Sequence, residues 1–302
     1  MNHRELVELI RLEKQEKDAV ILVHNYQPPD IQDTGDYVGD SLGLALQASR
    51  TEAQVIVFCG VHFMAETAAI LNPDRIVLLP DIRAGCPMAD MAPVKDVVRA
   101  RKKHPDAAVV SYVNTTAAVK AESDYCCTSS NAVRVCRKID ADEILFLPDT
   151  NLAAYVAARL PEKKIIPWDG FCHVHQDITA QDIRQALFEH PGAQVIAHPE
   201  CTREVSAMAD HVASTSGMLT AALESSATEF IVATETGMLY PLARGAPGKR
   251  FYPASSRALC PNMKLITLPK ILKALQTLEP EVKVPEHVRT RALLPVERML
   301  KP

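Results

Sequence analysis

The 302-residue sequence lacks long apolar runs, a large excess of either charge and an apolar leader. Stretches such as 107–110 and 230–233 end at polar residues, far short of the ~20 residues that a membrane-spanning helix requires. A net charge of −4 argues against a nucleic-acid or membrane-surface partner. The first eight residues mix both charges, unlike a signal peptide, so a cytoplasmic protein is expected.

Common nucleotide-binding and hydrolase motifs are absent as well. The sequence contains no Walker A loop, no dinucleotide glycine fingerprint and no G-x-S-x-G elbow. Its composition, 47% hydrophobic and 23% charged, is that of an ordinary globular protein. Eight cysteines in a cytoplasmic chain are better explained by metal or redox chemistry than by disulfides.

What the sequence does contain is one pattern repeated three times. A short β-branched run ends in polar residues in each copy, and the matched positions His24, Tyr112 and His198 are 88 and 86 residues apart. Each copy carries a hydroxyl 17 residues after this position and a cysteine 60 or 62 residues after it. The predicted strands are 21–26, 55–58 and 75–79 in the first copy, 109–114, 143–146 and 164–166 in the second, and 195–200, 230–232 and 249–252 in the third.

Amphipathic or helix-forming segments separate these strands. Strands that alternate with helices predict parallel βαβ units and three-layer sandwiches. The predicted units are 1–86, 87–172 and 173–302, the last including a closing helix at 268–278 and a tail, 280–302, with no assigned role. The other predicted helices are 4–17, 41–48, 93–104, 129–137, 179–190 and 216–224.

Three such units could form a row or close around a pseudo-threefold axis. Ligands of α/β sheets bind beyond the carboxyl ends of the strands, where matched polar residues occur in all three copies. The expected fold class is therefore α/β, with three homologous three-layer α/β/α sandwich repeats around a pseudo-threefold axis and the active site at the centre.

Closure would bring together one cysteine from each unit: Cys86, Cys172 and Cys260. Three thiolates and an open coordination position could hold catalytic zinc, or an iron–sulfur cluster with one iron free to act as a Lewis acid. The alternative is that shared ancestry alone keeps three cysteines at equivalent places. Against it, other equivalent positions hold different residue types, such as His, Tyr and His.

The hydroxyl that lies 17 residues after each strand-end position belongs to Ser41, Ser129 or Thr215, and each is near an expected helix start. Plain N-capping is one interpretation. The other is an anion site, because helix N-termini present free N–H groups and partial positive charge to carboxylates and phosphates.

Polar residues at the strand ends supply acid–base groups. Two imidazoles, one carboxylate and neutral donors could orient a polar substrate and move protons. Alternation would send both members of each pair to the same side of a strand. The pairs are His24-x-Tyr26, Tyr112-x-Asn114 and His198-x-Glu200.

The remaining cysteines are weaker candidates: Cys59, Cys126, Cys127, Cys136 and Cys201. Free cysteine is often a small buried hydrophobe. A competing local pattern, Cys172-x-x-His175, could be half of a zinc site, but the sequence offers no convincing second half.

In an ordered set of motifs spanning nearly the whole chain, the sequence resembles the quinolinate synthase family. The motifs are His24-Asn25-Tyr26-Gln27, Gly39-Asp40-Ser41-Leu42, Gly85-Cys86-Pro87-Met88-Ala89-Asp90-Met91, Tyr112-Val113-Asn114-Thr115, Thr128-Ser129-Ser130-Asn131-Ala132, Cys172-His173-Val174-His175, His198-Pro199-Glu200-Cys201 and Cys260-Pro261-Asn262-Met263-Lys264.

The resemblance implies a [4Fe–4S] cluster on Cys86, Cys172 and Cys260 with one open iron. It implies condensation of iminosuccinate with dihydroxyacetone phosphate to quinolinate, phosphate and water in de novo NAD biosynthesis. An aspartate-oxidising enzyme that supplies iminosuccinate is a candidate partner. The implied catalytic residues are Glu200, Tyr26 and His198, and the implied substrate-binding residues are His24, Ser41, Tyr112, Val113, Asn114, Ser129, His198, Pro199, Glu200 and Thr215.

One departure from the family concerns the last cysteine. Some members carry a C-x-x-C-x-x-C run there, whereas this chain has Ala254 and Arg257 at the two upstream positions. A redox switch using that run is not expected. Other function classes consistent with the residues are a zinc lyase or hydrolase, an iron–sulfur redox sensor and a small-anion binding protein.

Overall fold

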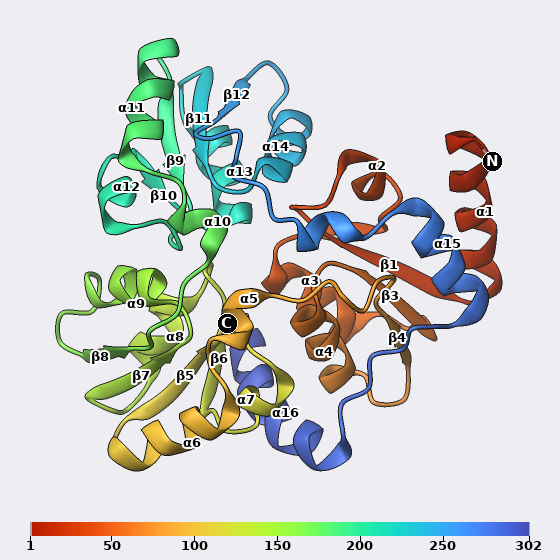
Figure 1. Cartoon of the computed structure of the whole chain (residues 1–302), viewed down its shortest axis with the longest axis horizontal. Coiled ribbons are helices and arrows are strands. Elements are labelled where there is room, and N and C mark those ends of the chain that lie inside the picture. The colour runs from red at the N-terminus through yellow and green to blue at the C-terminus, as the bar shows by residue number, and fades with distance from the viewer. Residues whose placement is uncertain (1, 302) are drawn as a thin grey trace.

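The computed structural model describes residues 2–301, which form three parallel four-stranded sheets surrounded by helices (Figure 1). The strand order is the same in each: β2-β1-β3-β4, β6-β5-β7-β8 and β10-β9-β11-β12. This confirms the predicted α/β class with three sandwich repeats. Figure 1 shows three lobes grouped around a common centre, near which the short helices α5 and α10 lie.

The order of elements repeats from unit to unit. When the short helix after each cysteine is counted with the unit before it, the first two units extend to Asp90 and Gln176, four residues beyond the predicted 86 and 172. The first unit contains α1 (His3–Glu16), β1 (Ala19–His24), α2 (Pro29–Gln32), β2 (Tyr37–Gly39), α3 (Ser41–Arg50), β3 (Val55–Cys59), α4 (His62–Leu71), β4 (Ile76–Leu78) and α5 (Pro87–Asp90). The second contains α6 (Val94–Lys103), β5 (Ala108–Tyr112), α7 (Ala117–Lys120), β6 (Tyr125–Cys127), α8 (Ala132–Lys138), β7 (Glu143–Leu147), α9 (Thr150–Ala157), β8 (Lys164–Pro167) and α10 (His173–Gln176).

The third unit follows the same order and is extended at its end. It contains α11 (Ala180–Glu189), β9 (Gln194–Ala197), α12 (Arg203–Ala207), β10 (His211–Val212), α13 (Thr215–Glu224), β11 (Glu229–Ala233), the 3₁₀ helix η1 (Thr236–Met238), α14 (Leu239–Gly245), β12 (Arg250–Pro253) and a second 3₁₀ helix, η2 (Asn262–Leu265). Two further helices, α15 (Leu268–Thr277) and α16 (Glu286–Leu300), follow.

The central strands form because their residues are β-branched and apolar and can be buried on both faces. All five residues of β3 are buried, as are five of the six in β1, which is typical of parallel strands covered on both sides. The outer strands β2, β6 and β10 have only two or three residues each. The sequence patterns predicted three strands per unit, so the fourth strand is an addition from the structure.

A carboxylate fixes the start of the first strand in every unit. Asp36 accepts the backbone N–H of Ile21 at 2.8 Å, and the backbone N–H of Asp36 donates to the carbonyl of Ile21 at 2.9 Å. The same reciprocal pair joins Asp124 to Val109 and Asp210 to Val195. These aspartates are 88 and 86 residues apart, which extends the repeat to a structural hydrogen bond.

The segment 280–302, to which the sequence assigned no role, contains α16. This helix contacts β6 and α7 of the second unit and α3 and α4 of the first (Figure 1). Ala292, Val296 and Met299 are fully buried on its packed side. Among residues 2–301, no helix has the length and apolarity needed to cross a bilayer.

Candidate active site

A single cavity at the meeting point of the three units brings together most of the residues singled out from the sequence. The two exceptions are Val113 and Pro199, which are buried beside wall residues but do not line the cavity. A row of separate units would not create this shared wall. The predicted residues on it are His24, Tyr26, Ser41, Cys86, Tyr112, Asn114, Ser129, Cys172, His198, Glu200, Thr215 and Cys260.

Each cavity cysteine lies directly before a short helix. Cys86 precedes α5, Cys172 precedes α10, and Cys260 is followed by Pro261 and η2. Burial raises the pKa of all three thiols, that of Cys86 to about 12, although backbone N–H groups of the following turn oppose the rise. Helix N-termini stabilise thiolates, so the three sulfurs are suited to bind a cation that would replace their protons.

The strand-end pairs reach the cavity by a different route from the one predicted. The strands end at His24, Tyr112 and Ala197, so strand alternation does not place the second member of each pair. Tyr26, Asn114 and Glu200 instead lie in the turns that follow, and they still line the same wall.

Two of these turns use an imidazole in the same way. Nδ1 of His24 accepts the backbone N–H of Tyr26 at 3.2 Å, and Nδ1 of His198 accepts that of Glu200 at 3.3 Å. Because Nδ1 accepts, the proton of the neutral ring is assigned to Nε2. Burial is the main cause that lowers the pKa of both rings to about 3. Both histidines therefore act as neutral hydrogen-bond donors.

These two histidines predict a specific pH dependence of stability for the metal-free chain. Unfolding returns their pKa from about 3 to about 6.5, so the unfolded chain binds protons that the folded chain excludes. Their contribution is complete above about pH 6.5 and is lost as the pH falls, by up to about 1.4 kcal/mol per pH unit for each histidine. The free energy of unfolding, measured with urea between pH 7 and 5, should show this slope. In His198→Asn the slope should correspond to about one proton fewer taken up on unfolding. An unchanged slope in that variant would contradict the prediction.

Glu200 is a buried acidic group of the cavity wall. Burial opposes its ionisation, but the imidazole of His175 and hydrogen bonds from His175 and Tyr112 outweigh burial and lower its pKa. Tyr112 Oη donates to Oε1 at 2.5 Å, and His175 Nδ1 lies 2.8 Å from Oε2. Burial, and then the charge of Glu200, raise the pKa of both Tyr112 and Tyr26. The cavity thus pairs an ionised carboxylate with protonated phenols.

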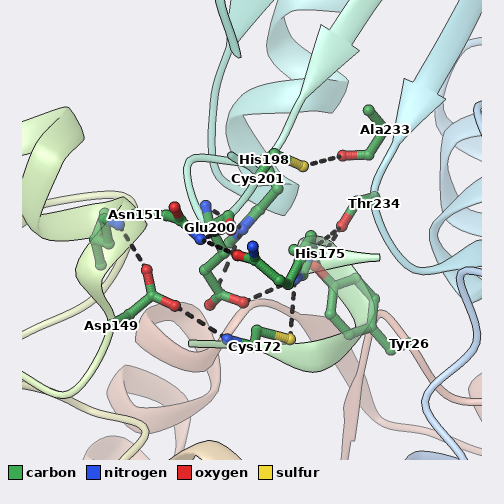
Figure 2. A network of polar contacts seen from close by, with 12 residues as sticks. Tyr26, Asp149, Asn151, Cys172, His175, His198, Glu200, Cys201, Ala233 and Thr234 are labelled. Atoms are coloured by element: carbon green, nitrogen blue, oxygen red, sulfur yellow. Dashed lines mark hydrogen bonds and ion pairs between the residues drawn. The ribbon is translucent and has the colours of Figure 1, made fainter. Parts of the chain in front are cut away.

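His175 and Thr234 link these groups, as Figure 2 shows. Thr234 Oγ1 lies 2.7 Å from Tyr26 Oη and 2.8 Å from His175 Nε2. His175 Nδ1 is also 3.1 Å from the sulfur of Cys172. Cys172, His175 and Glu200 each place a ligand atom within 4.8 Å of the others, which gives the Cys172-x-x-His175 pattern the third residue it lacked in the sequence.

The hydroxyl positions are not the helix caps that the sequence suggested. The side chain of Asp40 caps α3 and that of Ser214 caps α13. In the second unit α8 begins at Ala132, three residues after Ser129, without a side-chain cap. The N-capping interpretation is therefore wrong for all three, namely Ser41, Ser129 and Thr215. Thr215 Oγ1 accepts a bond from Asn25 Nδ2 at 2.8 Å.

One polar atom of the wall lacks a partner. Asn114 Oδ1 is buried without a hydrogen bond, a costly arrangement unless a ligand supplies a donor. The cavity therefore contains donors from the imidazoles and hydroxyls together with one acceptor suited to an N–H or O–H group of a substrate.

Several wall residues were not predicted as site residues, although three of them lie in the quoted motifs: Asp40, Val61, Phe63, Met64, Met88, Glu235 and Met263. Apolar residues at these positions give no chemical signal by themselves. Glu235 is different: it lies 86 residues after Asp149, and Asp149 lies 88 after Val61, the same offsets as the strand-end markers.

Comparison with known proteins agrees with the geometry. The model of a family described as "Quinolinate synthetase A protein" matches residues 8–301. The chain belongs to the quinolinate synthetase A family. It is 52% identical over 300 residues to the quinolinate synthase of Methanosarcina barkeri (strain Fusaro), covering 99% of this chain and 98% of the relative.

Other members of the quinolinate synthetase A family align over similar lengths. The quinolinate synthase of Desulforudis audaxviator is 54% identical over 297 residues, 98% of each chain. That of Dehalococcoides mccartyi (strain CBDB1) is 52% identical over 288 residues, 95% of each chain. The family resemblance inferred from the ordered motifs is thereby confirmed.

Proposed function

We propose that this protein is a quinolinate synthase that joins iminosuccinate to dihydroxyacetone phosphate, giving quinolinate, phosphate and two molecules of water in NAD biosynthesis. Family membership and the names of its relatives support the proposal. The observation that carries it is the central cavity, where one cysteine from each unit faces an ionised carboxylate and two protonated phenols.

The donor set of the cavity suits an iron–sulfur cluster. Cys86, Cys172 and Cys260 would hold it, and none of the other five cysteines lines the cavity, so a four-iron cluster would keep one iron without a protein thiolate. When bound, such a cluster supplies an open Lewis-acid iron. All-thiolate ligation of this kind is typical of iron–sulfur centres.

The other wall residues suit the two substrates. Iminosuccinate carries two carboxylates and dihydroxyacetone phosphate carries a phosphate, all of which accept hydrogen bonds. Neutral Nε2–H groups of His24 and His198 and the hydroxyl of Ser41 can donate to them without first being protonated. Asn114 Oδ1, which has no partner, can accept the N–H of the nitrogen-bearing substrate.

Proton movement is assigned to Glu200 and the phenols. The ionised Glu200 can take a proton from a substrate carbon or hydroxyl, and a base at this position contributes typically 10²–10⁴-fold. Tyr26 and Tyr112 stay protonated and can donate to a departing oxygen. The hydrogen bond from Tyr112 to Glu200 holds the carboxylate in place between proton transfers.

A second candidate rests on the group formed by Cys172, His175 and Glu200. Three protein ligands of mixed type with an open position are typical of catalytic zinc, and this group would make the protein a zinc lyase or hydrolase. It uses only one of the three cavity cysteines, so the two candidates predict different metals and different ligands.

Anaerobic purification with metal analysis tests the proposal. We expect a brown protein with about four irons per chain that bleaches in air, and quinolinate formation when iminosuccinate and dihydroxyacetone phosphate are supplied. A colourless protein with one tightly bound zinc would refute the cluster. Four irons without turnover would refute the synthase and support a redox sensor.

The proposed compartment is the cytoplasm, and the proposed source of iminosuccinate is an enzyme that oxidises aspartate. None of the eight cysteines forms a disulfide, as expected in a compartment where thiols are kept reduced.

A further inference from the structure

Two buried carboxylates occupy equivalent places next to the cavity and have no role in the chemistry proposed above. Asp149 and Glu235 are 0% and 1% exposed, and each follows the third strand of its unit, β7 or β11. They are 86 residues apart, and the matching residue of the first unit, 88 residues before Asp149, is Val61.

Each carboxylate connects a helix start to a cysteine. Asp149 Oδ1 accepts the N–H of Leu152 at 2.6 Å and thereby caps α9, while Oδ2 accepts the backbone N–H of Cys172 at 3.2 Å (Figure 2). Glu235 Oε2 accepts the N–H of Gly237 at 2.7 Å, and Oε1 accepts the backbone N–H of Cys260 at 3.0 Å. The two units thus use one hydrogen-bonding scheme at the same register.

Such groups are expensive to bury, because a carboxylate loses its hydration and regains it only through well-placed donors. Glu235 has an additional partner in Lys264, whose Nζ lies 2.8 Å from Oε1 and also donates to the carbonyl of Tyr26. A neutral cap such as serine would start the helices equally well. Serine has a single side-chain oxygen, whereas Asp149 and Glu235 each use two, one for the helix start and one for a cysteine N–H. The second oxygen therefore points to the second contact, the one with the cysteine.

The first unit lacks this connection. Val61 has no side-chain acceptor, and its side chain faces the cavity. The loop that carries Cys86 is held by two other hydrogen bonds. The backbone N–H of His62 donates to the Ala84 carbonyl at 2.7 Å, and the side-chain Nδ2 of Asn262, from the third unit, donates to the Gly85 carbonyl at 2.9 Å.

We propose that Asp149 and Glu235 are positioning residues that fix the backbone of Cys172 and Cys260 so that both sulfurs are preorganised for the metal centre, while the Cys86 loop is held without a carboxylate. This proposal rests on the proposed three-cysteine site. Groups that orient the metal ligands by hydrogen bonding, without contacting the metal, typically contribute 10–100-fold to metal affinity.

The test uses the nearly isosteric Asp149→Asn and Glu235→Gln in the full-length chain. In either amide the oxygen can keep the helix cap, but the NH₂ group then faces the cysteine N–H and cannot accept from it. Hydrogen exchange of the folded, metal-free protein is measured by mass spectrometry at segments 170–174, 258–262 and 84–88. Removing this hydrogen bond should speed exchange by about fivefold or more, at 170–174 only in Asp149→Asn and at 258–262 only in Glu235→Gln.

The matched control is Asp210→Asn, which removes a carboxylate that accepts a strand N–H in the third unit but does not touch a cysteine. It should leave all three segments unchanged. After anaerobic reconstitution, the two test variants should lose iron to a chelator about tenfold faster than the wild type or more, and the control should not.

The outcomes separate the two proposals. Wild-type protein that takes up no iron refutes the proposed function whatever the exchange data show. Wild-type protein with four irons, together with variants whose cysteine segments and iron loss are unchanged, refutes the positioning role. Faster exchange throughout the chain would refute it as well, because the carboxylates would then support overall stability and not the cysteine loops.

Discussion

Alanine in place of Cys86, Cys172 or Cys260 is expected to lower bound iron from about four per chain to less than one and to abolish quinolinate formation. Each sulfur comes from a different unit and faces the same cavity, so no neighbouring thiol can replace the one removed. A cluster left with two protein thiolates would be lost on purification, since metal binding and ligand number are coupled. The measurement is iron and sulfide per chain after anaerobic reconstitution, with a quinolinate assay on the same samples.

Cys59→Ala and Cys201→Ala are the matched controls. Both side chains are buried, 0% and 2% exposed, and neither lines the cavity. Both should retain about four irons. The three alanine variants also distinguish the competing metal site: if only Cys172→Ala lost the metal while Cys86→Ala and Cys260→Ala kept it, the group of Cys172, His175 and Glu200 would be the true ligand set.

Glu200→Gln should keep the iron and lose turnover by about 10²–10⁴-fold, the usual contribution of a general base. Glutamine preserves the shape of the side chain and can still accept the bond from Tyr112, but it cannot take a proton at neutral pH. The measurements are iron content and kcat for quinolinate, compared with Glu143→Gln, which removes a carboxylate paired with Lys164 on the outer part of β7.

Two results would contradict this assignment. Near-normal turnover would remove Glu200 from the acid–base role. Loss of metal in Glu200→Gln would show that the carboxylate is a ligand, as the mixed zinc site requires.

The repeat made much of the fold predictable from the sequence. The inner strands are long enough and apolar enough to give a clear signal, and their spacing of 88 and 86 residues fixed which segments are equivalent. One edge strand of each sheet was missed, namely β2, β6 or β10, because these have only two or three residues and no clear run of β-branched residues. Helix α16 was missed because charged residues and Pro295 interrupt its apolar side, so tertiary packing decides its conformation.

The candidate site was predictable where chemistry and register coincide. Three cysteines at one equivalent position indicate a shared site, whereas the partners of Glu200 come from turns and loops whose direction a strand pattern does not specify. His175 was visible only as half of a zinc motif, and Thr234 gave no signal. Asp149 and Glu235 could have been found by extending the repeat comparison to positions at which only two of three copies are alike.

Helix α16 has a consequence for how the protein is made. It is translated after all twelve strands, yet it packs on both the first and the second unit, and the carbonyl of Met299 accepts a bond from Asn131 at 3.0 Å. Asn131 directly follows the cavity loop that carries Ser129. During synthesis the second unit therefore leaves the ribosome with an apolar face still uncovered, and the cavity wall next to it gains this support only when α16 emerges. Termination of synthesis before α16 would release a chain with three sheets but an unfinished cavity, a substrate for chaperones and proteases.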